Sequence, residues 1–250
     1  MAGISVTSVT DFPEIKPSDD LSEIIGDALV ALAPSDNDII VVAQKIASKA
    51  ENRFRRLSEV RPSAQALEIA ARCEKDPRIV ELVLQDSLGI VRVGPGILIA
   101  QHRSGHIMAN AGIDRSNVLG DEDTVLLLPE DPDRWCRDTM TALNARFGVR
   151  VGVVMADSFG RPWRLGTAGV AIGVAGISAR LDVRGQPDRF GRLLESTEIG
   201  IADEIAAAAS LVMGQTNEGI PVCLLRGLTI PGQGVAADLL RPLERDLFRK

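Results

Sequence analysis

Cysteine and long apolar runs are both scarce in this chain. Cysteine occupies only three of the 250 positions, namely Cys73, Cys136 and Cys223. The number is odd, the three are far apart and none belongs to a Cys-x-x-Cys pair, which argues against a disulfide or zinc framework and for reduced, buried thiols. No uncharged run approaches membrane-spanning length, and the first residues lack a basic stretch followed by an apolar core. We therefore expect a soluble, cytoplasmic protein without membrane contact.

An excess of basic charge is also missing. The formal net charge is −6 at pH 7, so nothing in the balance favours binding to a nucleic-acid backbone or an anionic membrane surface. Internal repeats, low-complexity segments and obvious linkers do not occur. With 45% hydrophobic and 25% charged residues, a chain of this length can bury a sizeable core in one large domain or two small ones. We treat residues 1–250 as one functional unit without a defined internal boundary.

The strand and helix patterns alternate too irregularly for a doubly wound parallel sheet. We therefore expect a mixed α+β architecture of largely antiparallel sheets with packing helices. Strands are expected within residues 38–43, 90–93, 97–100, 125–128, 150–157, 166–176 and 222–225, and helices from Asp20, Pro62 and Asp76, over 131–148 and 197–213, and after 234. The charged segment 182–192 should form a long exposed loop that could cover an anionic substrate.

The densest cluster of functional groups follows the valine-rich run at 150–156. This run is typical of a buried strand, and we expect it to end at Asp157, Ser158 and a turn that contains Arg161 and Arg164. Asp157 and Ser158 offer hard oxygen ligands to Mg²⁺ or Mn²⁺, and the two arginines offer forked donors to phosphate or carboxylate. A strand that runs into a solvated turn is the alternative, and these residues alone do not separate the two interpretations.

Two other strand ends carry polar groups. Residues 44–53 hold three cations directly after an apolar run, which suits a phosphate-bearing ligand, although a charged and solvated helix start explains the pattern as well. Asp114 and Asn117 follow another apolar stretch. Asp114 could converge with Asp157 on a pair of divalent cations, unless Asp114 and Asn117 only form an Asx-type turn.

Two further patterns indicate a structural role rather than a metal or nucleotide site. His102 and His106 are four residues apart, but Ser104 and Gly105 between them indicate a tight turn, so we expect both histidines beside a β-hairpin rather than on a metal. The glycine-dense segment 166–176 is neither a Walker A loop nor a dinucleotide fingerprint. It predicts a strand that passes close to another backbone or to a ligand.

Several spaced motifs occur along the chain, namely Asn110-Ala-Gly-Ile-Asp114-x-Ser-Asn117, Asp157-Ser-Phe-Gly-Arg-Pro-Trp-Arg164-x-Gly166, Ala202-Asp-Glu-Ile-Ala206 with Met213-Gly-Gln215, Ile46–Glu51 and Phe12–Ile15. Together they resemble the coenzyme F420-0:L-glutamate ligase family, also called the F420 γ-glutamyl ligase family, and the similarity covers nearly the whole chain. The family's two-domain form carries a C-terminal nitroreductase-like flavin domain, for which this chain is too short, so we expect the stand-alone ligase.

The resemblance implies an enzyme that uses GTP to join the carboxylate of F420-0 to the amine of L-glutamate and then adds further γ-linked glutamates. A carboxylate is a poor electrophile, so the expected route runs through an acyl phosphate without a protein nucleophile. The family also implies Mg²⁺ or Mn²⁺ at two sites, assistance by K⁺, and an intertwined homodimer of two-domain subunits with the nucleotide at the dimer interface. A metal-dependent phosphohydrolase and a non-catalytic GTP-binding regulator are the alternatives.

The family motifs also assign roles to residues of this chain. Asp114 and Asp157 would hold one divalent cation, and Ser158 and Gln215 would hold a second. Our own hypothesis is that Arg161 and Arg164 grip the phosphodiester or carboxylate of the deazaflavin substrate during catalysis. The guanine nucleotide would contact Thr10, Asp11, Phe12, Pro13, Gln44, Lys45, Lys49, Asn117, Met213, Gly214, Gln215, Thr216, Asn217, Glu218, Gly219 and Ile220.

Overall fold

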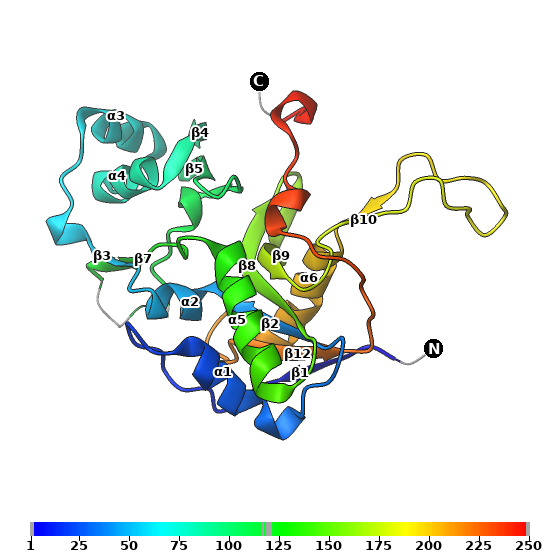
Figure 1. Cartoon of the computed structure of the whole chain (residues 1–250). Helices are drawn as coiled ribbons and strands as arrows, with labels where there is room; N and C mark the ends of the chain where they lie inside the picture. Colours follow the sequence, from blue (N-terminus) through cyan, green and yellow to red (C-terminus); the bar gives the residue numbers. More distant parts are fainter. Residues whose placement is uncertain (1–2, 117, 119–121, 249–250) are drawn as a thin grey trace.

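A five-stranded mixed sheet forms the centre of the molecule in this computed structural model, which describes residues 3–116, 118 and 122–248 (Figure 1). The strand order is β1-β12-β2-β8-β9. β2 and β8 run parallel, and the other neighbours in the sheet are antiparallel. The bounds are β1 Ser5–Ser8, β2 Ile39–Ala43, β8 Gly152–Arg161, β9 Arg164–Ala175 and β12 Val222–Arg226.

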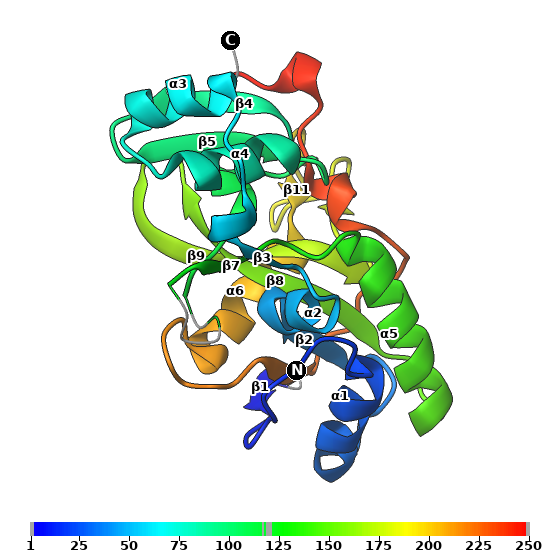
Figure 2. The same cartoon turned by 90° about the vertical axis from the view of Figure 1, so that its left-hand side faces the viewer.

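Helices cover both faces of this sheet, which explains why its central strands are apolar on both sides. On one face, Ile40 and Val42 of β2 belong to the core that packs under α1 (Leu21–Leu29) and α5 (Pro132–Phe147). On the other face, Ile39 and Val41 join the core under α6 (Ile201–Met213). Figure 2 shows α1, α2 (Gln44–Ala50) and α5 on the near side of the sheet.

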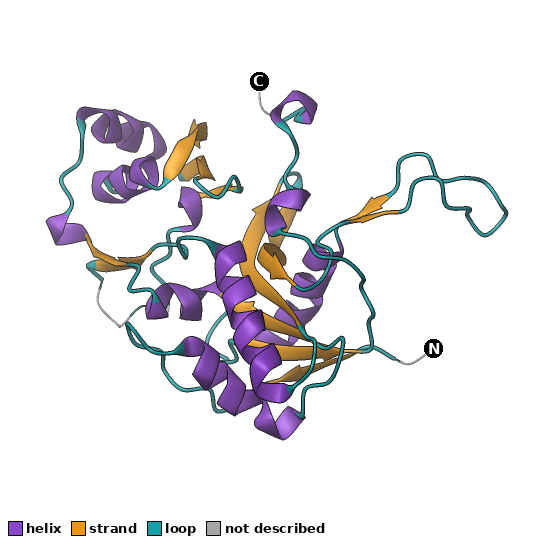
Figure 3. Ribbon diagram, viewed as in Figure 1, coloured by secondary structure: helices purple, strands orange, loops and turns teal. Residues whose placement is uncertain are grey.

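A smaller lobe packs beside the sheet, at the upper left of Figure 1. Helices α3 and α4 lie on a three-stranded antiparallel sheet in the order β4-β5-β6 (Figure 3). The lobe has its own hydrophobic core, which includes Leu82 and Leu98. A short ladder of β3 and β7 joins it to the rest. The bounds are α3 Ala64–Cys73, α4 Pro77–Gln85, β3 Phe54–Arg56, β4 Ser87–Gly94, β5 Ile97–His102, β6 Ile107–Ala109 and β7 Thr124–Leu126.

The predicted helix starts are confirmed by their caps. The side chains of Asp20, Ser63, Asp76 and Asp131 each accept a hydrogen bond from a backbone N–H in the first turn of the helix that follows. The predicted hairpin is also confirmed, because His102 ends β5 and the returning strand β6 begins just after His106.

Close backbone packing explains the glycine-dense strand. A Cβ atom added at Gly169 would lie 2.3 Å from the carbonyl oxygen of Ala206 in α6, and one at Gly173 would lie 2.5 Å from that of Pro132 in α5. Both distances are far below van der Waals contact, so only glycine allows both helices to approach β9. The predicted approach of another backbone is therefore confirmed.

Two predicted boundaries and one predicted helix are wrong. β8 does not end at Asp157 but continues to Arg161, because β9 pairs with it across that whole length, Asp157 opposite Val170. Helix α6 begins at Ile201 rather than Thr197, since Glu198–Ile199 (β11) pairs with Leu181–Asp182 (β10). After Gly234, the described residues form only short 3-10 turns at Ala236–Leu239 and Leu243–Arg245 instead of a terminal helix.

The loop between β10 and β11 is exposed and projects from the body of the protein, at the right of Figure 1, as expected for residues 182–192. Across the part of the chain that the structure describes, no helix has both the length and the apolar character needed to cross a membrane.

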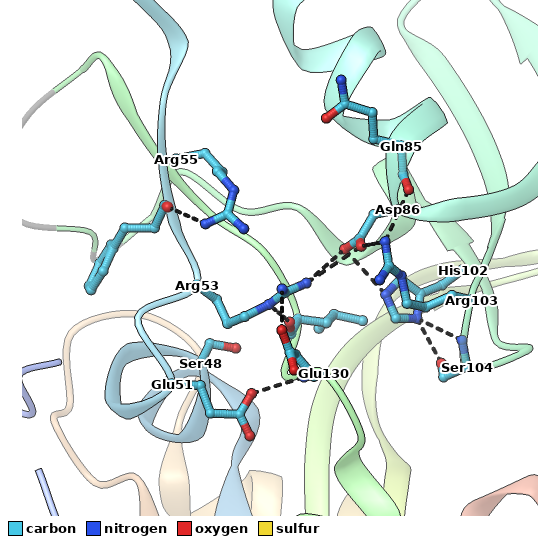
Figure 4. Close-up of polar contacts among 12 residues, drawn as sticks. Ser48, Glu51, Arg53, Arg55, Gln85, Asp86, His102, Arg103, Ser104 and Glu130 are labelled. Carbon is cyan, nitrogen blue, oxygen red and sulfur yellow. Dashed lines mark hydrogen bonds and ion pairs between the residues drawn. The ribbon is translucent and has the colours of Figure 1, made fainter. Parts of the chain in front are cut away.

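A buried charge network ties the small lobe to the chain that leaves α2 (Figure 4). Arg53 donates from Nε to the carbonyl of Leu128 at 2.8 Å, and its Nη2 lies 3.4 Å from Oδ2 of Asp86 at the end of α4. Asp86 also pairs with Arg103 at 2.6 Å and faces the buried His102. Burial alone would raise the pKa of Asp86, but His102 and the two arginines outweigh it and hold that pKa below its ordinary value.

Candidate functional site

A cavity of about 540 Å³ opens where the parallel strands β2 and β8 part. Ala43 and Ala156 form their last pair, after which β2 turns into α2 while β8 continues alone on that side. The loop from α6 enters β12 at the same edge of the sheet. Ligands of α/β sheets commonly bind at the carboxyl ends of parallel strands, and this edge has that geometry.

Most of the predicted nucleotide and metal residues line this cavity. They are Phe12, Pro13, Gln44, Lys45, Lys49, Asp157, Ser158 and all of residues 213–220. Thr10, Asp11 and Asp114 are outside the lining, although Asp114 contacts a lining lysine. Asn117 falls outside the described residues. Segments near residues 12, 44, 157 and 215 therefore meet in space although they are far apart in the sequence.

Lys45 and Asp114 form an ion pair beside the cavity. Nζ of Lys45 lies 2.7 Å from Oδ2 of Asp114, and Ser116 donates its backbone N–H to Oδ1 of the same carboxylate at 2.7 Å. Burial alone would raise the pKa of Asp114, but the hydrogen bonds from Lys45 and Ser116 outweigh it and hold that pKa below its ordinary value. The lowered pKa favours the anionic form of Asp114, and its Asx-type turn with Ser116 exists together with its position beside the cavity.

Asp157 is a carboxylate whose surroundings disfavour its charge. Burial raises its pKa from 3.8 to about 6, and the nearby charge of Asp114 acts in the same direction, against the opposing effects of Ser158, Lys45 and Gln44. Two neighbouring carboxylates of which one resists ionisation form a donor pair that a divalent cation would neutralise. The donor chemistry therefore fits Mg²⁺ or Mn²⁺ between Asp114 and Asp157.

Carboxylates and imidazoles alone do not make a complete metal site here. Among the described residues, no group of three or more histidine, cysteine, aspartate or glutamate side chains converges. Further ligands must come from hydroxyl and amide oxygens such as those of Ser158 and Gln215, from water or from a bound phosphate.

A second ion pair lies across the cavity. Nζ of Lys49 lies 2.5 Å from Oε1 of Glu14, and the Lys49 side chain is only 10% exposed. Lys49 belongs to α2, whose buried Ser48 hydroxyl donates to Oε1 of the equally buried Gln44 at 2.9 Å. The expected alternative of a charged, solvated helix start is therefore wrong for this face of α2, because the residues that point inward are held by specific partners.

The loop after α6 forms another wall. Gly214 ends the helix with a φ of 71°, a conformation that favours glycine. Oε2 of Glu218 accepts the backbone N–H of Thr216 at 2.8 Å, and Oε1 accepts its hydroxyl at 3.1 Å. These bonds hold the pKa of Glu218 below its ordinary value, so the loop keeps a charged carboxylate at the cavity.

Arg161 and Arg164 lie apart from this cluster within one chain. They face each other at the exposed tip of the β8–β9 hairpin, outside the cavity lining. Four residues of extended strand separate Arg161 from Asp157, which corresponds to roughly 13 Å at about 3.3 Å per residue. The structure therefore does not bring the two arginines to Asp114 and Asp157.

The sequence also missed residues of the site. Glu14, Ser210 and Pro221 line the cavity. Ser116 accepts a hydrogen bond from the lining residue Lys45, and Thr167 donates one to the lining residue Gln215. Ser116 could have been found from its place two positions after Asp114, where it closes an Asx turn. Glu14 lies in the Phe12–Ile15 motif, but that motif gave it no role, because its partner Lys49 is distant in the sequence.

Fold and cavity together define a mixed α+β protein with an oxygen-rich site, suited to a phosphate-bearing ligand, at the carboxyl edge of a parallel strand pair. Residues 10–227 match the model of a family described as F420-0:Gamma-glutamyl ligase, and the chain belongs to this family.

Similar proteins carry a consistent name. The coenzyme F420:L-glutamate ligase of Methanothermobacter thermautotrophicus is 44% identical over 252 residues, which cover 99% of each chain. The protein of that name from Methanocaldococcus jannaschii is 42% identical over 223 residues, or 88% of each chain. The one from Haloarcula marismortui is 41% identical over 254 residues, covering 99% of this chain and 96% of the relative.

Proposed function

We propose that this chain is a ligase of coenzyme F420 biosynthesis, which uses GTP to join L-glutamate to F420-0 and then adds further γ-linked glutamates. The observation that carries the proposal is the convergence of the family's motifs on one cavity: Asp157, Lys45, Lys49 and the loop 213–220 surround the same space. Relatives named coenzyme F420:L-glutamate ligase that align over almost the whole chain support the same activity.

The charge of the cavity supports joint binding of nucleotide and metal. Two lysines, Lys45 and Lys49, and three carboxylates, Glu14, Asp157 and Glu218, line it, and each lysine already contacts a carboxylate. A triphosphate would therefore meet no excess of positive charge from the protein. Divalent cations at Asp114 with Asp157, and at Ser158 with Gln215, would supply it.

The residues suit transfer of the GTP γ-phosphoryl group to the F420-0 carboxylate, which releases GDP. The glutamate amine would then attack the acyl phosphate, which releases inorganic phosphate and a proton. Lys45 and Lys49 would neutralise charge on the phosphoryl oxygens once the nucleotide displaces their carboxylate partners. Divalent cations, when bound, would polarise the phosphate and orient it. The carboxylates of Asp114 and Asp157 would fix that arrangement, and no protein side chain needs to form a covalent bond.

The proposal includes a homodimer. Exposed apolar side chains at the two projecting segments support it, because Trp163 at the hairpin tip is 81% exposed and Phe190 in the β10–β11 loop is 85% exposed. In such a dimer, Arg161 and Arg164 would act on the substrate carboxylate or phosphodiester bound to the partner subunit. K⁺ would assist, as in the family.

Mass spectrometry of the products tests the activity. The purified chain is incubated with F420-0, L-glutamate, GTP and Mn²⁺, beside the variant Asp157→Ala. A matched control is Asp138→Ala, since Asp138 is exposed on α5 and its ion pair with Arg134 is loose at 3.6 Å. We expect products heavier by one or more glutamates from the wild type and Asp138→Ala, and none from Asp157→Ala. Consumption of GTP without glutamate addition would favour a phosphohydrolase, and binding without turnover a regulator.

A further inference from the structure

Thr167 and Gln215 place two oxygens side by side at the edge of the cavity. Oγ1 of Thr167 lies 2.5 Å from Oε1 of Gln215, across 48 residues of sequence. Neighbouring ligands of an octahedral Mg²⁺ are about 2.9 Å apart, because the metal–oxygen bonds are 2.0–2.1 Å long and meet at right angles. The two oxygens are thus already close to the separation that a shared cation requires.

Strand register places Ser158 on the same face. Gly169 pairs directly with Ser158 across the β8–β9 ladder and faces the Ala206 carbonyl of α6. Thr167 is two residues from Gly169, so its side chain points to the same face of β9 and is a diagonal neighbour of Ser158. Gln215 follows the C-terminus of α6 on this face. Three side-chain oxygens from β8, β9 and the loop after α6 therefore lie in one neighbourhood.

None of these three donors carries charge. Asp157 precedes Ser158 and points to the opposite face of β8, where it belongs with Asp114 and Lys45. Both carboxylate oxygens of Glu218 are engaged by Thr216 in its own loop. Neutral oxygens alone hold a divalent cation weakly, whereas Asp114 and Asp157 bring negative charge to the first site. A cation beside Ser158 and Gln215 needs an anionic ligand from outside the protein.

We propose that Thr167 is a third protein ligand of the second divalent cation, together with Ser158 and Gln215, and that this neutral set holds the cation only when a phosphate group is bound beside it. This inference rests on the proposed function, which supplies the nucleotide phosphates. Thr167 then has a role in cation binding. The first cation binds without nucleotide, whereas the second binds only with nucleotide.

Mn²⁺ binding measured by electron paramagnetic resonance tests the inference without any turnover. The wild-type chain should bind one Mn²⁺ alone and a second only after a non-hydrolysable GTP analogue is added. Thr167→Val should weaken the second Mn²⁺ on the order of tenfold and leave the first unchanged, whereas Thr167→Ser should keep both. Thr141→Val is the matched control, because the Thr141 hydroxyl is exposed on α5 and donates to the carbonyl of Arg137.

Different failures have different meanings. If Thr167→Val binds the second Mn²⁺ as tightly as the wild type, or if Thr167→Ser is as weak as Thr167→Val, Thr167 is not a ligand and the proposed function is untouched. If the wild type binds both ions without nucleotide, the dependence on phosphate is wrong. If the wild type binds no GTP analogue at all, the proposed function fails and this inference with it. Thr167→Ala provides a second variant without the hydroxyl in case valine disturbs the strand.

Discussion

Nζ of Lys45 contacts Oδ2 of Asp114 at 2.7 Å, so the lysine that should meet a phosphate is held by a carboxylate that should meet a metal. We expect a cation at Oδ2 of Asp114 to compete with Lys45, which would free the ammonium for a nucleotide phosphate. Lys45 would then couple metal binding to phosphate binding.

Lys45→Met should separate the two events. Loss of the competing ammonium should strengthen Mn²⁺ binding to the chain without nucleotide several-fold, while GTP-analogue binding should weaken on the order of tenfold because a charge-assisted bond is lost. Isothermal titration calorimetry measures both. Lys75→Met, in the turn between α3 and α4, is the control and should change neither. Weaker Mn²⁺ binding in Lys45→Met would contradict the competition.

Asp157→Asn should stabilise the metal-free protein. The pKa of Asp157 is raised from 3.8 to about 6, so its stabilising contribution is present below pH 3.8 and is lost as pH rises through 6. Ionisation at pH 7.5 then costs the folded state up to about 3 kcal/mol, at ~1.4 kcal/mol per pKa unit. Urea unfolding at pH 7.5 should show the variant more stable by part of this amount, with little difference at pH 4. Added Mn²⁺ should stabilise only the wild type, and an unchanged unfolding midpoint at pH 7.5 would count against this account of Asp157.

His106 should make the fold sensitive to acid. Burial lowers its pKa from 6.5 to about 4, and the neighbouring His102 acts in the same direction. The contribution of neutral His106 is complete above pH 6.5 and is lost as pH falls through 4, by up to about 3 kcal/mol. Thermal unfolding across this range should show a smaller loss of Tm for His106→Gln than for the wild type. Parallel curves for the two proteins would assign the acid sensitivity to other groups.

Substitutions of Arg53 and Arg103 should lower the free energy of unfolding by different amounts, although both arginines pair with Asp86. Arg53 is buried and Arg103 is half exposed. Arg53→Met should lower the free energy of unfolding by about 3–5 kcal/mol, because a buried carboxylate loses a buried partner. Arg103→Met should cost clearly less, since water can replace an exposed partner. Equal losses in urea unfolding would show that burial does not set the difference.

Gly169 and Gly160 offer a matched pair on the β8–β9 hairpin. A Cβ at Gly169 meets the backbone of α6 at 2.3 Å, and one at Gly160 meets nothing within 4 Å. Gly169→Ala should therefore destabilise the protein by about 1–3 kcal/mol through overpacking, and Gly160→Ala should be nearly neutral. Chemical denaturation of both variants checks this, and a neutral Gly169→Ala would mean that α6 can move away at little cost.

Local signals explain which features the sequence predicted. Caps such as Asp20 and Ser63 act within one helical turn, so the sequence near each helix start was sufficient. The end of β8 depends on its pairing with β9, and the start of α6 depends on the β10–β11 pair, so both boundaries were set by partners elsewhere in the chain. The short strand β1 is polar and half exposed, and it forms because β12 offers it an edge.

The same distinction between local signals and distant partners applies to the candidate site. The motifs around Asp157, Lys45 and Gln215 predicted which segments gather at the cavity. They could not predict that Lys49 pairs with Glu14, or that Arg161 sits on the far tip of a hairpin, because both depend on how distant segments pack. Thr167 gave no motif at all, and its contact with Gln215 depends on the position of α6 against β9.

The small lobe has its own hydrophobic core, so Asp114 and Asp157 belong to two separately packed parts of the protein. Asp114 follows Ile113, which packs in that core, whereas Asp157 follows Met155 and Ala156 of the central sheet. A cation bound by both carboxylates would link the small lobe to the central sheet, which have separate hydrophobic cores. The distance between the two carboxylates would then change with the orientation of the lobe relative to the sheet. Mutations far from the cavity that change this orientation would therefore alter which divalent cation is preferred.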